Sequence, residues 1–112
     1  MADPTSPGWH CPIEAALEVI GGKWKSVIIW HLRDDTLRFS ELRRLMPAAT
    51  RKMLTQQLRQ LEHDDIVNRV VYPEVPPRVE YSLTAYGRTL RPVMDAMKHW
   101  GVDHVRLRHV DS

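Results

Sequence analysis

The 112-residue sequence lacks the segments that direct a chain to a membrane or to an oxidising compartment. No apolar run approaches the roughly 18–20 residues that a helix needs to cross a bilayer. The first residues, MADPTSPGWHCP, contain no basic stretch followed by an apolar core, so they predict no secretion signal. The single cysteine, Cys11, cannot form a disulfide within one chain, although a disulfide between two chains stays open. We therefore expect a cytoplasmic protein with no membrane partner.

The sequence also lacks the residue groupings of an enzyme or a metal site. It contains no Gly-rich phosphate loop and no Ser/His/Asp set. His99, His104 and His109 recur every five residues, so successive ones lie about 140° apart on a helix and cannot share a metal ion. His31 falls in a strongly apolar segment and is expected to be a core residue. These features predict no catalytic activity, no metal and no cofactor.

The most informative absence is that of carboxylates between Thr50 and Leu61, in the stretch TRKMLTQQLRQL. Leucines at helix spacing give this stretch one apolar face, and its opposite face carries Arg51, Lys52, Thr55, Gln56 and Arg59. Between residues 23 and 59 there are nine Lys or Arg against three acids, whereas the rest of the chain has more acids than bases. A basic middle between acidic flanks predicts a polyanion-binding face, although charge alone fits a solvated basic surface equally well.

The length predicts one domain over residues 11–112, preceded by a Pro/Gly/Ser-rich arm over residues 1–10. Cys11-Pro12 predicts a helix start, and Gly21-Gly22 predicts its end. A buried helix is expected from about residue 23, and a short helix follows from Phe39 until Pro47 ends it. Thr50 is then expected to cap a helix over about residues 50–64.

The C-terminal half predicts a β-hairpin and one long helix. Two strand-like stretches, IVNRVVYP and VEYSLT, are joined by EVPPR and span about residues 67–84. The short stretch TLRF before the third helix is expected to be extended. Thr84 is expected to cap a helix over about residues 85–108, with Pro92 bending it from inside. The fold class expected is mainly α with a small β-hairpin.

A short helix, a tight turn and an acid-free helix form a helix-turn-helix, and the hairpin that follows is a wing. Such a helix fits the major groove of B-DNA, where base edges and phosphates exclude carboxylates. Gln56 or Gln57 is expected to pair with adenine, Arg51 with guanine, and Thr50 with a phosphate at the helix N-terminus. Arg78 at the wing tip is expected to enter a minor groove. Backbone contacts are assigned to Lys23, Lys25, Arg43 and Arg44.

Nearly the whole chain, about residues 9–101, resembles the HxlR-type winged helix-turn-helix regulators of the MarR-like superfamily. The resemblance rests on CPIEAALEVIGGKW, RFSELRRLMP, MLTQQLRQLE and VYPEVPPRVEYSLTAYGRTLRPV. It implies a homodimer built from the terminal helices, a roughly palindromic operator and, most commonly, repression. Two departures stand out: Asp64-Asp65 replaces Asp-Gly before the wing, a turn that Asp can still adopt, and DDTL replaces a Gly-Pro loop.

Two further expectations concern assembly and signal. One winged helix offers few base contacts, and the last helix carries more apolar surface than a small core needs, so we expect a dimer with recognition helices roughly 34 Å apart. Cys11 beside His10 at a helix N-terminus favours a reactive thiolate, and some members of the resembled family sense oxidants or electrophiles through this cysteine. The alternative is that Cys11 only packs the arm.

Two other readings of function stay open. In the first, a small-molecule effector binds in the dimer interface, in a pocket lined by Trp9, Trp24, Trp30 or Trp100. In the second, the winged helix is a protein-interaction module without sequence-specific DNA binding, and the salt dependence of duplex binding distinguishes it from a regulator.

Overall fold

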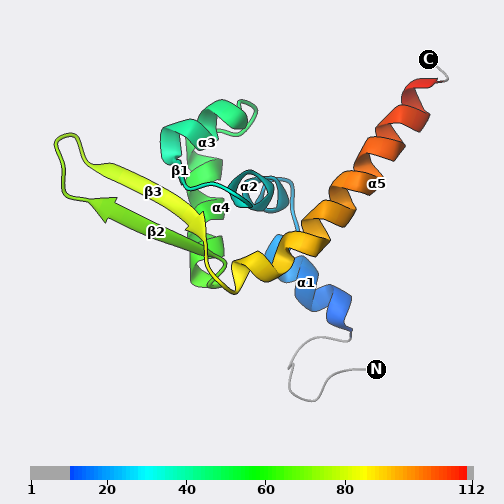
Figure 1. Cartoon of the computed structure of the whole chain (residues 1–112), viewed down its shortest axis with the longest axis horizontal. Coiled ribbons are helices and arrows are strands. Elements are labelled where there is room, and N and C mark those ends of the chain that lie inside the picture. The colour runs from blue at the N-terminus through cyan, green and yellow to red at the C-terminus, as the bar shows by residue number, and fades with distance from the viewer. Residues whose placement is uncertain (1–10, 111–112) are drawn as a thin grey trace.

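The computed structural model of the protein describes residues 11–110, and the arm expected over residues 1–10 lies outside them. Helices α1 (Pro12–Ile20) and α2 (Lys25–Leu32) precede strand β1 (Leu37–Arg38), α3 (Phe39–Leu45) and α4 (Arg51–His63). Strands β2 (Val67–Tyr72) and β3 (Arg78–Leu83) form a hairpin, and the 3₁₀ helix η1 (Gly87–Leu90) leads into α5 (Arg91–Val110). The hairpin projects from one side of the helices, and the far half of α5 projects from the other (Figure 1).

Helix α2 lies at the centre of the core because it is apolar nearly all round. Ile28 and Ile29 are fully buried, and α2 packs against all four other α-helices and against β3. Helix α4 contributes the leucines that recur at helix spacing, Leu54, Leu58 and Leu61, each at most 1% exposed. The apolar face of α4 therefore packs inward and leaves its polar face toward solvent.

The sheet has three strands rather than the two of a simple hairpin. Its order is β1-β3-β2, and both pairings are antiparallel. The short stretch expected to be extended is β1, which places Leu37 opposite Tyr81 and Arg38 opposite Glu80. This pairing connects the start of α3 to the base of the wing.

The turn between α4 and the wing depends on Asp65 and Thr84. Asp65 has a φ of 61°, so the left-handed conformation expected for aspartate at this position is confirmed. The Thr84 hydroxyl donates to the backbone oxygen of Asp65 at 2.6 Å and accepts from the N–H of Gly87 at 2.8 Å. A Cβ at Gly87 would lie 2.2 Å from the backbone oxygen of Ile66, so only glycine fits this approach.

The last helix differs from the expectation of one helix over residues 85–108 with a bend at Pro92. The Thr84 hydroxyl accepts the N–H of Gly87, the first residue of the 3₁₀ helix η1, and the α-helix itself begins only at Arg91. Pro92 is therefore the second residue of α5 rather than an interior residue. A proline in the first turn lacks an N–H that would have no partner within the helix, so it is compatible with a regular helix start.

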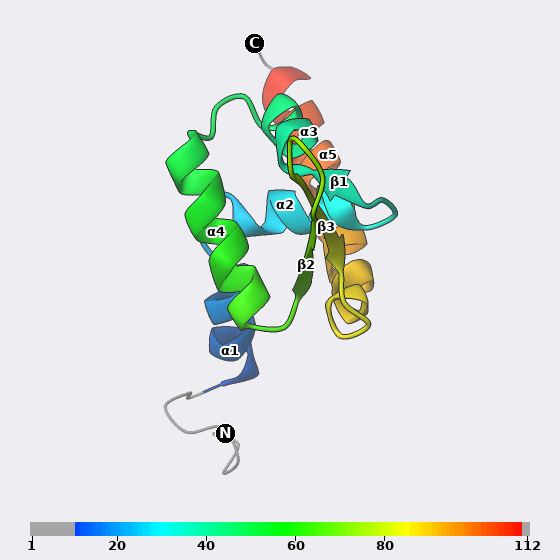
Figure 2. The same ribbon diagram turned by 90° about the vertical axis from the view of Figure 1, so that its left-hand side faces the viewer.

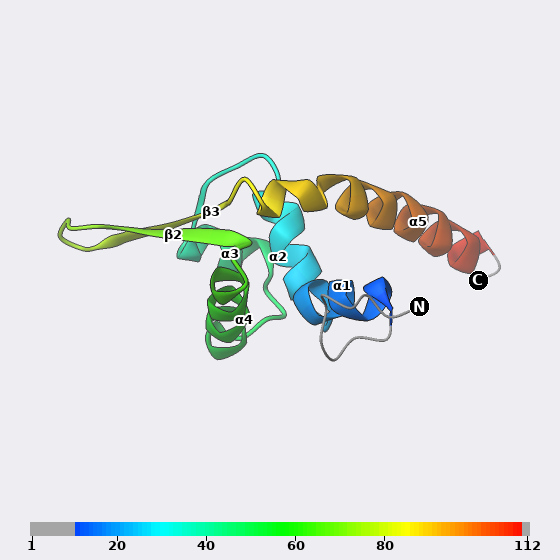
Figure 3. The same cartoon turned by 90° about the horizontal axis from the view of Figure 1, so that it is seen from below.

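Helices α1 and α5 lie on the side of the molecule away from the wing (Figure 3). Both carry large apolar side chains that the protomer leaves in solvent: Ile13 and Leu17 on α1, and Val93, Met97, Trp100, Val102, Val105 and Leu107 on α5. The Trp100 ring stacks on His104 at 4.8 Å and is 67% exposed. Apolar surface of this extent marks an interaction face. Among the described residues, no helix combines the length and the hydropathy needed to span a membrane.

Candidate nucleic-acid interface

Helices α3 and α4 form the helix-turn-helix. Glu41 in the first turn of α3 accepts the backbone N–H of Arg38 at 2.8 Å, which fixes the start of that helix. The turn over residues 46–50 buries Met46 and Ala49. The Thr50 hydroxyl accepts the backbone N–H of Met53 at 3.1 Å, as expected of the residue that caps α4.

The outward face of α4 is cationic and polar. Arg51, Lys52, Gln56 and Arg59 are exposed, and Thr55 is half-buried. Among residues 11–110, no ion pair involves the three bases of this face. Helix α4 lies at the outer edge of the protein beside the hairpin, and no other helix or strand of residues 11–110 lies over its outward face (Figure 2). The structure thus brings together the side chains that the sequence predicted as base readers.

The four lysines and arginines assigned to backbone contacts divide into two groups. Arg43 and Arg44 in the last turn of α3 are exposed, as is Lys23 before α2. Lys25 is only 9% exposed, and its ammonium donates to the backbone oxygen of Glu18 at 3.4 Å. Lys25 therefore satisfies a carbonyl in the last turn of α1, and the expectation that it contacts DNA is corrected.

Arg78 also differs from its expected place. It is the first residue of β3, and its guanidinium lies 3.2 Å from Glu74 and 3.4 Å from Glu80, and 4.0 Å from the ring of Tyr72. Its side chain is 27% exposed. A guanidinium held by two carboxylates and an aromatic ring is not free to enter a minor groove, so the expectation of a minor-groove arginine at the tip is corrected.

Two exposed arginines, Arg38 and Arg69, were not among the residues that the sequence predicted to bind DNA. Arg38 lies directly before α3, and Arg69 lies on the outer strand β2. The position of Arg38 within the basic middle of the chain was visible in the sequence. Its place beside the wing was not, because that place depends on the pairing of β1 with β3.

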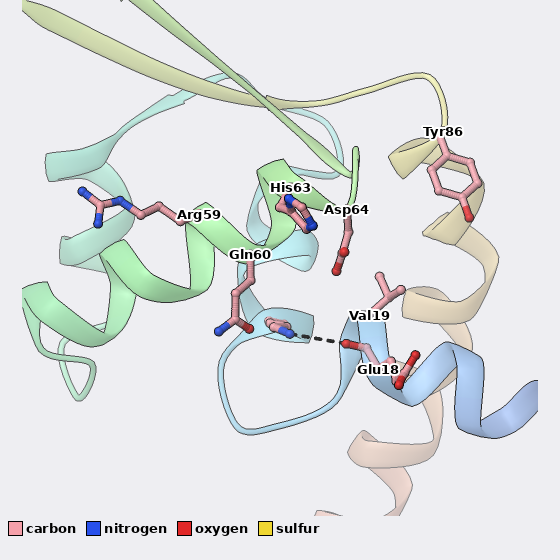
Figure 4. A pocket seen from close by; sticks show the side chains of 8 residues that line it. Glu18, Val19, Arg59, Gln60, His63, Asp64 and Tyr86 are labelled. Carbon is pink, nitrogen blue, oxygen red and sulfur yellow. Dashed lines mark hydrogen bonds between the residues drawn. The ribbon is translucent and has the colours of Figure 1, made fainter. Parts of the chain in front are cut away.

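A cavity of about 600 Å³ lies between α1 and the C-terminal end of α4, and Figure 4 shows it. Its charged lining mixes the acids Glu18 and Asp64 with Lys25 and Arg59, and Tyr86 closes one side. The tryptophan-lined effector pocket expected in a dimer interface stays a prediction, because it would need a second protomer. Trp30 lines a smaller cavity of about 240 Å³ between α2 and α5, whereas Trp100 is exposed and Trp9 lies outside the described residues.

Cys11 is the N-cap residue of α1 and has a free, half-buried thiol. Pro12 follows it in the first turn of the helix, as expected from the sequence. No hydrogen bond caps the helix through the Cys11 side chain. Cys11 thus lies at the N-terminus of α1, and α1 lies on the same side of the protein as α5 (Figure 3).

Comparison with known proteins gives one consistent result. The family model described as HxlR-like helix-turn-helix matches residues 19–109. The HTH-type transcriptional regulator YtcD of Bacillus subtilis is 53% identical over 104 residues, which cover 93% of this chain and 82% of YtcD. The solved structure of the redox regulator HypR in its reduced form gives a TM-score of 0.82 at 53% identity, covering 89% of this chain and 96% of HypR.

Another solved structure, the reduced form of the transcriptional regulator YodB from B. subtilis, gives a TM-score of 0.71 at 39% identity, covering 82% of this chain and 91% of YodB. Further neighbours are described as members of the MarR family. The expected winged helix-turn-helix fold is therefore confirmed. The relatives are transcriptional regulators rather than enzymes, and the chain belongs to the HxlR-like helix-turn-helix family of transcriptional regulators.

Proposed function

We propose that the protein is a homodimer in the cytoplasm that binds a roughly palindromic DNA site and represses transcription. The observation that carries this proposal is the exposed face of α4, which carries no acid before Glu62, is held by the Thr50 cap and is supported by three buried leucines. An α-helix with such a face fits the major groove, where its donors meet base edges and phosphates.

The base readers are Arg51 and Gln56, and Thr55 and Arg59 extend the contact along the helix. Gln57 is half-buried, which favours Gln56 over Gln57 as the partner of adenine. Lys52 and the N-terminus of α4 at Thr50 bind phosphate. Lys23, Arg43 and Arg44 hold the flanking backbone, where contacts set affinity but carry no sequence information.

Selection of bound sequences from random duplex DNA tests this assignment. Arg51→Ala and Gln56→Ala should each reduce the preference for the selected site by about 1–3 kcal/mol. Arg44→Ala should instead weaken binding to all sequences by the same factor. A protein-interaction module would show no steep linear fall of log K with log salt. If both α4 variants keep the full preference, the assignment of base readers is wrong. A reporter placed behind the selected site then distinguishes repression from activation.

The homodimer is supported by the exposed apolar faces of α1 and α5, which lie on the same side of the protein. Two-fold symmetry places two copies of α4 on one face of the duplex, with half-sites about one helical turn apart. The selected sequences should accordingly contain two inverted half-sites. A single half-site would contradict this part of the proposal.

We also propose that Cys11 makes DNA binding sensitive to oxidants. HypR is described as a redox regulator in oxidised and reduced forms, and YodB has been solved in a reduced and a diamide-treated form. With one cysteine per chain, two Cys11 thiols from two copies can form one disulfide, and diamide takes up the two electrons and two protons.

Diamide should change operator binding by the wild-type protein and leave Cys11→Ser unaffected. Non-reducing electrophoresis should show a linked pair only for the wild type. Equal responses of the two proteins would remove Cys11 from the mechanism.

A further inference from the structure

The wing and the helix-turn-helix enclose a second basic feature between them. A cleft of about 410 Å³ is lined by the start of α3, by the first residue of α4, and by the loop and first strand residues of the wing. Its lining has three cations, Arg38, Arg51 and Arg78, against one carboxylate, Glu74. Ser40 adds a hydroxyl, and Phe39 and Pro76 are among the apolar parts of its wall. This mixture of cations and apolar surface matches the phosphates and sugars of a nucleic acid backbone.

The position of the cleft follows from the two elements that border it. If α4 occupies a major groove and the wing reaches the adjacent minor groove, one DNA strand separates those grooves and must pass between the two elements. We propose that this cleft seats that single sugar-phosphate strand, that Arg38 contacts its phosphate, and that Arg78 neutralises the carboxylates at its rim. The inference rests on the proposed DNA-binding function and adds a contact that no base reader provides.

Arg38 is positioned for this role by its strand and its helix. Its backbone N–H is held by Glu41, and its Cα lies opposite Glu80 in the pairing of β1 with β3. The Glu80 carboxylate pairs with Arg78 instead, at 3.4 Å. Across residues 11–110, no ion pair involves Arg38, and the residue is exposed. Its charge is thus available to a phosphate.

Arg78 differs from Arg38, because its guanidinium already pairs with carboxylates of the protein itself. Its guanidinium bridges Glu74, which lines the cleft, and Glu80, which lies two residues further along β3. Its Nε is buried without a hydrogen-bond partner, and its guanidinium lies over the Tyr72 ring. Two carboxylates beside a DNA strand would repel it, so Arg78 is a positioning residue that keeps the cleft acceptable to phosphate.

The first experiment measures binding of the full chain to the selected duplex and to a scrambled duplex over a range of salt. Arg38→Ala should lower the affinity for both duplexes by the same factor of roughly ten. It should also reduce the slope of log K against log salt by about one. Arg38→Lys should keep most of that slope, and Arg88→Ala on η1 should match the wild type. An Arg38→Ala protein with the affinity and slope of the wild type would overturn the phosphate contact.

The second experiment separates a DNA contact by Arg78 from neutralisation. Arg78→Met keeps an unbranched stem over Tyr72 and should weaken binding roughly tenfold, because it releases two carboxylates. Adding Glu74→Gln and Glu80→Gln to that variant should restore most of the affinity. A triple variant as weak as Arg78→Met would overturn the neutralising role.

Failure of the inference differs visibly from failure of the proposed function. If the wild type shows no salt-dependent duplex binding, both are wrong. If the wild type binds its site with a steep salt dependence and Arg38→Ala binds with the same affinity and the same salt slope, only the inferred phosphate contact is wrong.

Discussion

Removal of Trp100 provides a quantitative test of the dimer. Trp100 is 67% exposed in the protomer, so the side chain contributes little to folding of one chain. An aromatic side chain of this size in the centre of an interface typically contributes about 2 kcal/mol or more to binding. A two-fold interface contains two copies, so Trp100→Ala should cost the dimer about 4 kcal/mol, which corresponds to roughly a thousandfold rise in its dissociation constant.

Sedimentation equilibrium over a wide range of protein concentrations measures that constant directly. Val75→Ala is a matched control, because Val75 is an apolar residue at the wing tip and is 101% exposed. Thermal unfolding monitored at a concentration where both proteins are monomeric should show that Trp100→Ala leaves the protomer intact. A dissociation constant equal to that of the Val75→Ala protein would refute the reasoning that α5 forms the interface.

Three further predictions concern local structure. Thr50→Ala removes the acceptor for the Met53 N–H and should lower the free energy of unfolding by about 1 kcal/mol in urea titrations, whereas Thr50→Ser should retain it. Asp65→Gly should raise the free energy of unfolding by roughly 1 kcal/mol, because glycine adopts a φ of 61° without the steric penalty; no gain would indicate that the aspartate side chain compensates. Burial, and secondarily the charge of Arg33, lowers the pKa of His31 from its ordinary 6.5. The unfolded chain then binds more protons, so stability should fall as pH drops below 6.5, and His31→Gln should flatten that dependence.

Most elements of the fold were predictable because their signals are local. Pro12 and Gly21-Gly22 bound α1, and Thr50 caps α4, as their positions in the sequence indicated. Apolar residues repeating every three or four positions specify which face of a helix packs inward. The lack of acids on the outward face of α4 before Glu62 was likewise visible, because that face follows from the same repeat.

The placements that failed depend on side-chain contacts that the order of residues does not reveal, although the partners lie within seven residues of one another. Lys25 was expected in solvent, but α1 packs beside α2 and offers the carbonyl of Glu18. Arg78 was expected to enter a minor groove from the wing tip, but Tyr72 meets it across the hairpin and Glu80 on its own strand pairs with it. A count of charges along the sequence cannot reveal such pairs, because it records which charges exist and not which of them neutralise each other.

The sequence by itself determined the order of helices and strands, the cap of α4 and the chemistry of its outward face, since each depends on residues within about two helical turns of one another. Only the tertiary structure decided that β1 joins β3, that Arg38 borders a cleft beside the wing, and that Lys25 and Arg78 turn their charges inward. The pairing of β1 with β3 joins segments far apart in the chain, whereas Lys25 and Arg78 find their partners within seven residues once the helices and the hairpin have packed. Burial and pairing thus decide which of the available charges remain free to meet DNA.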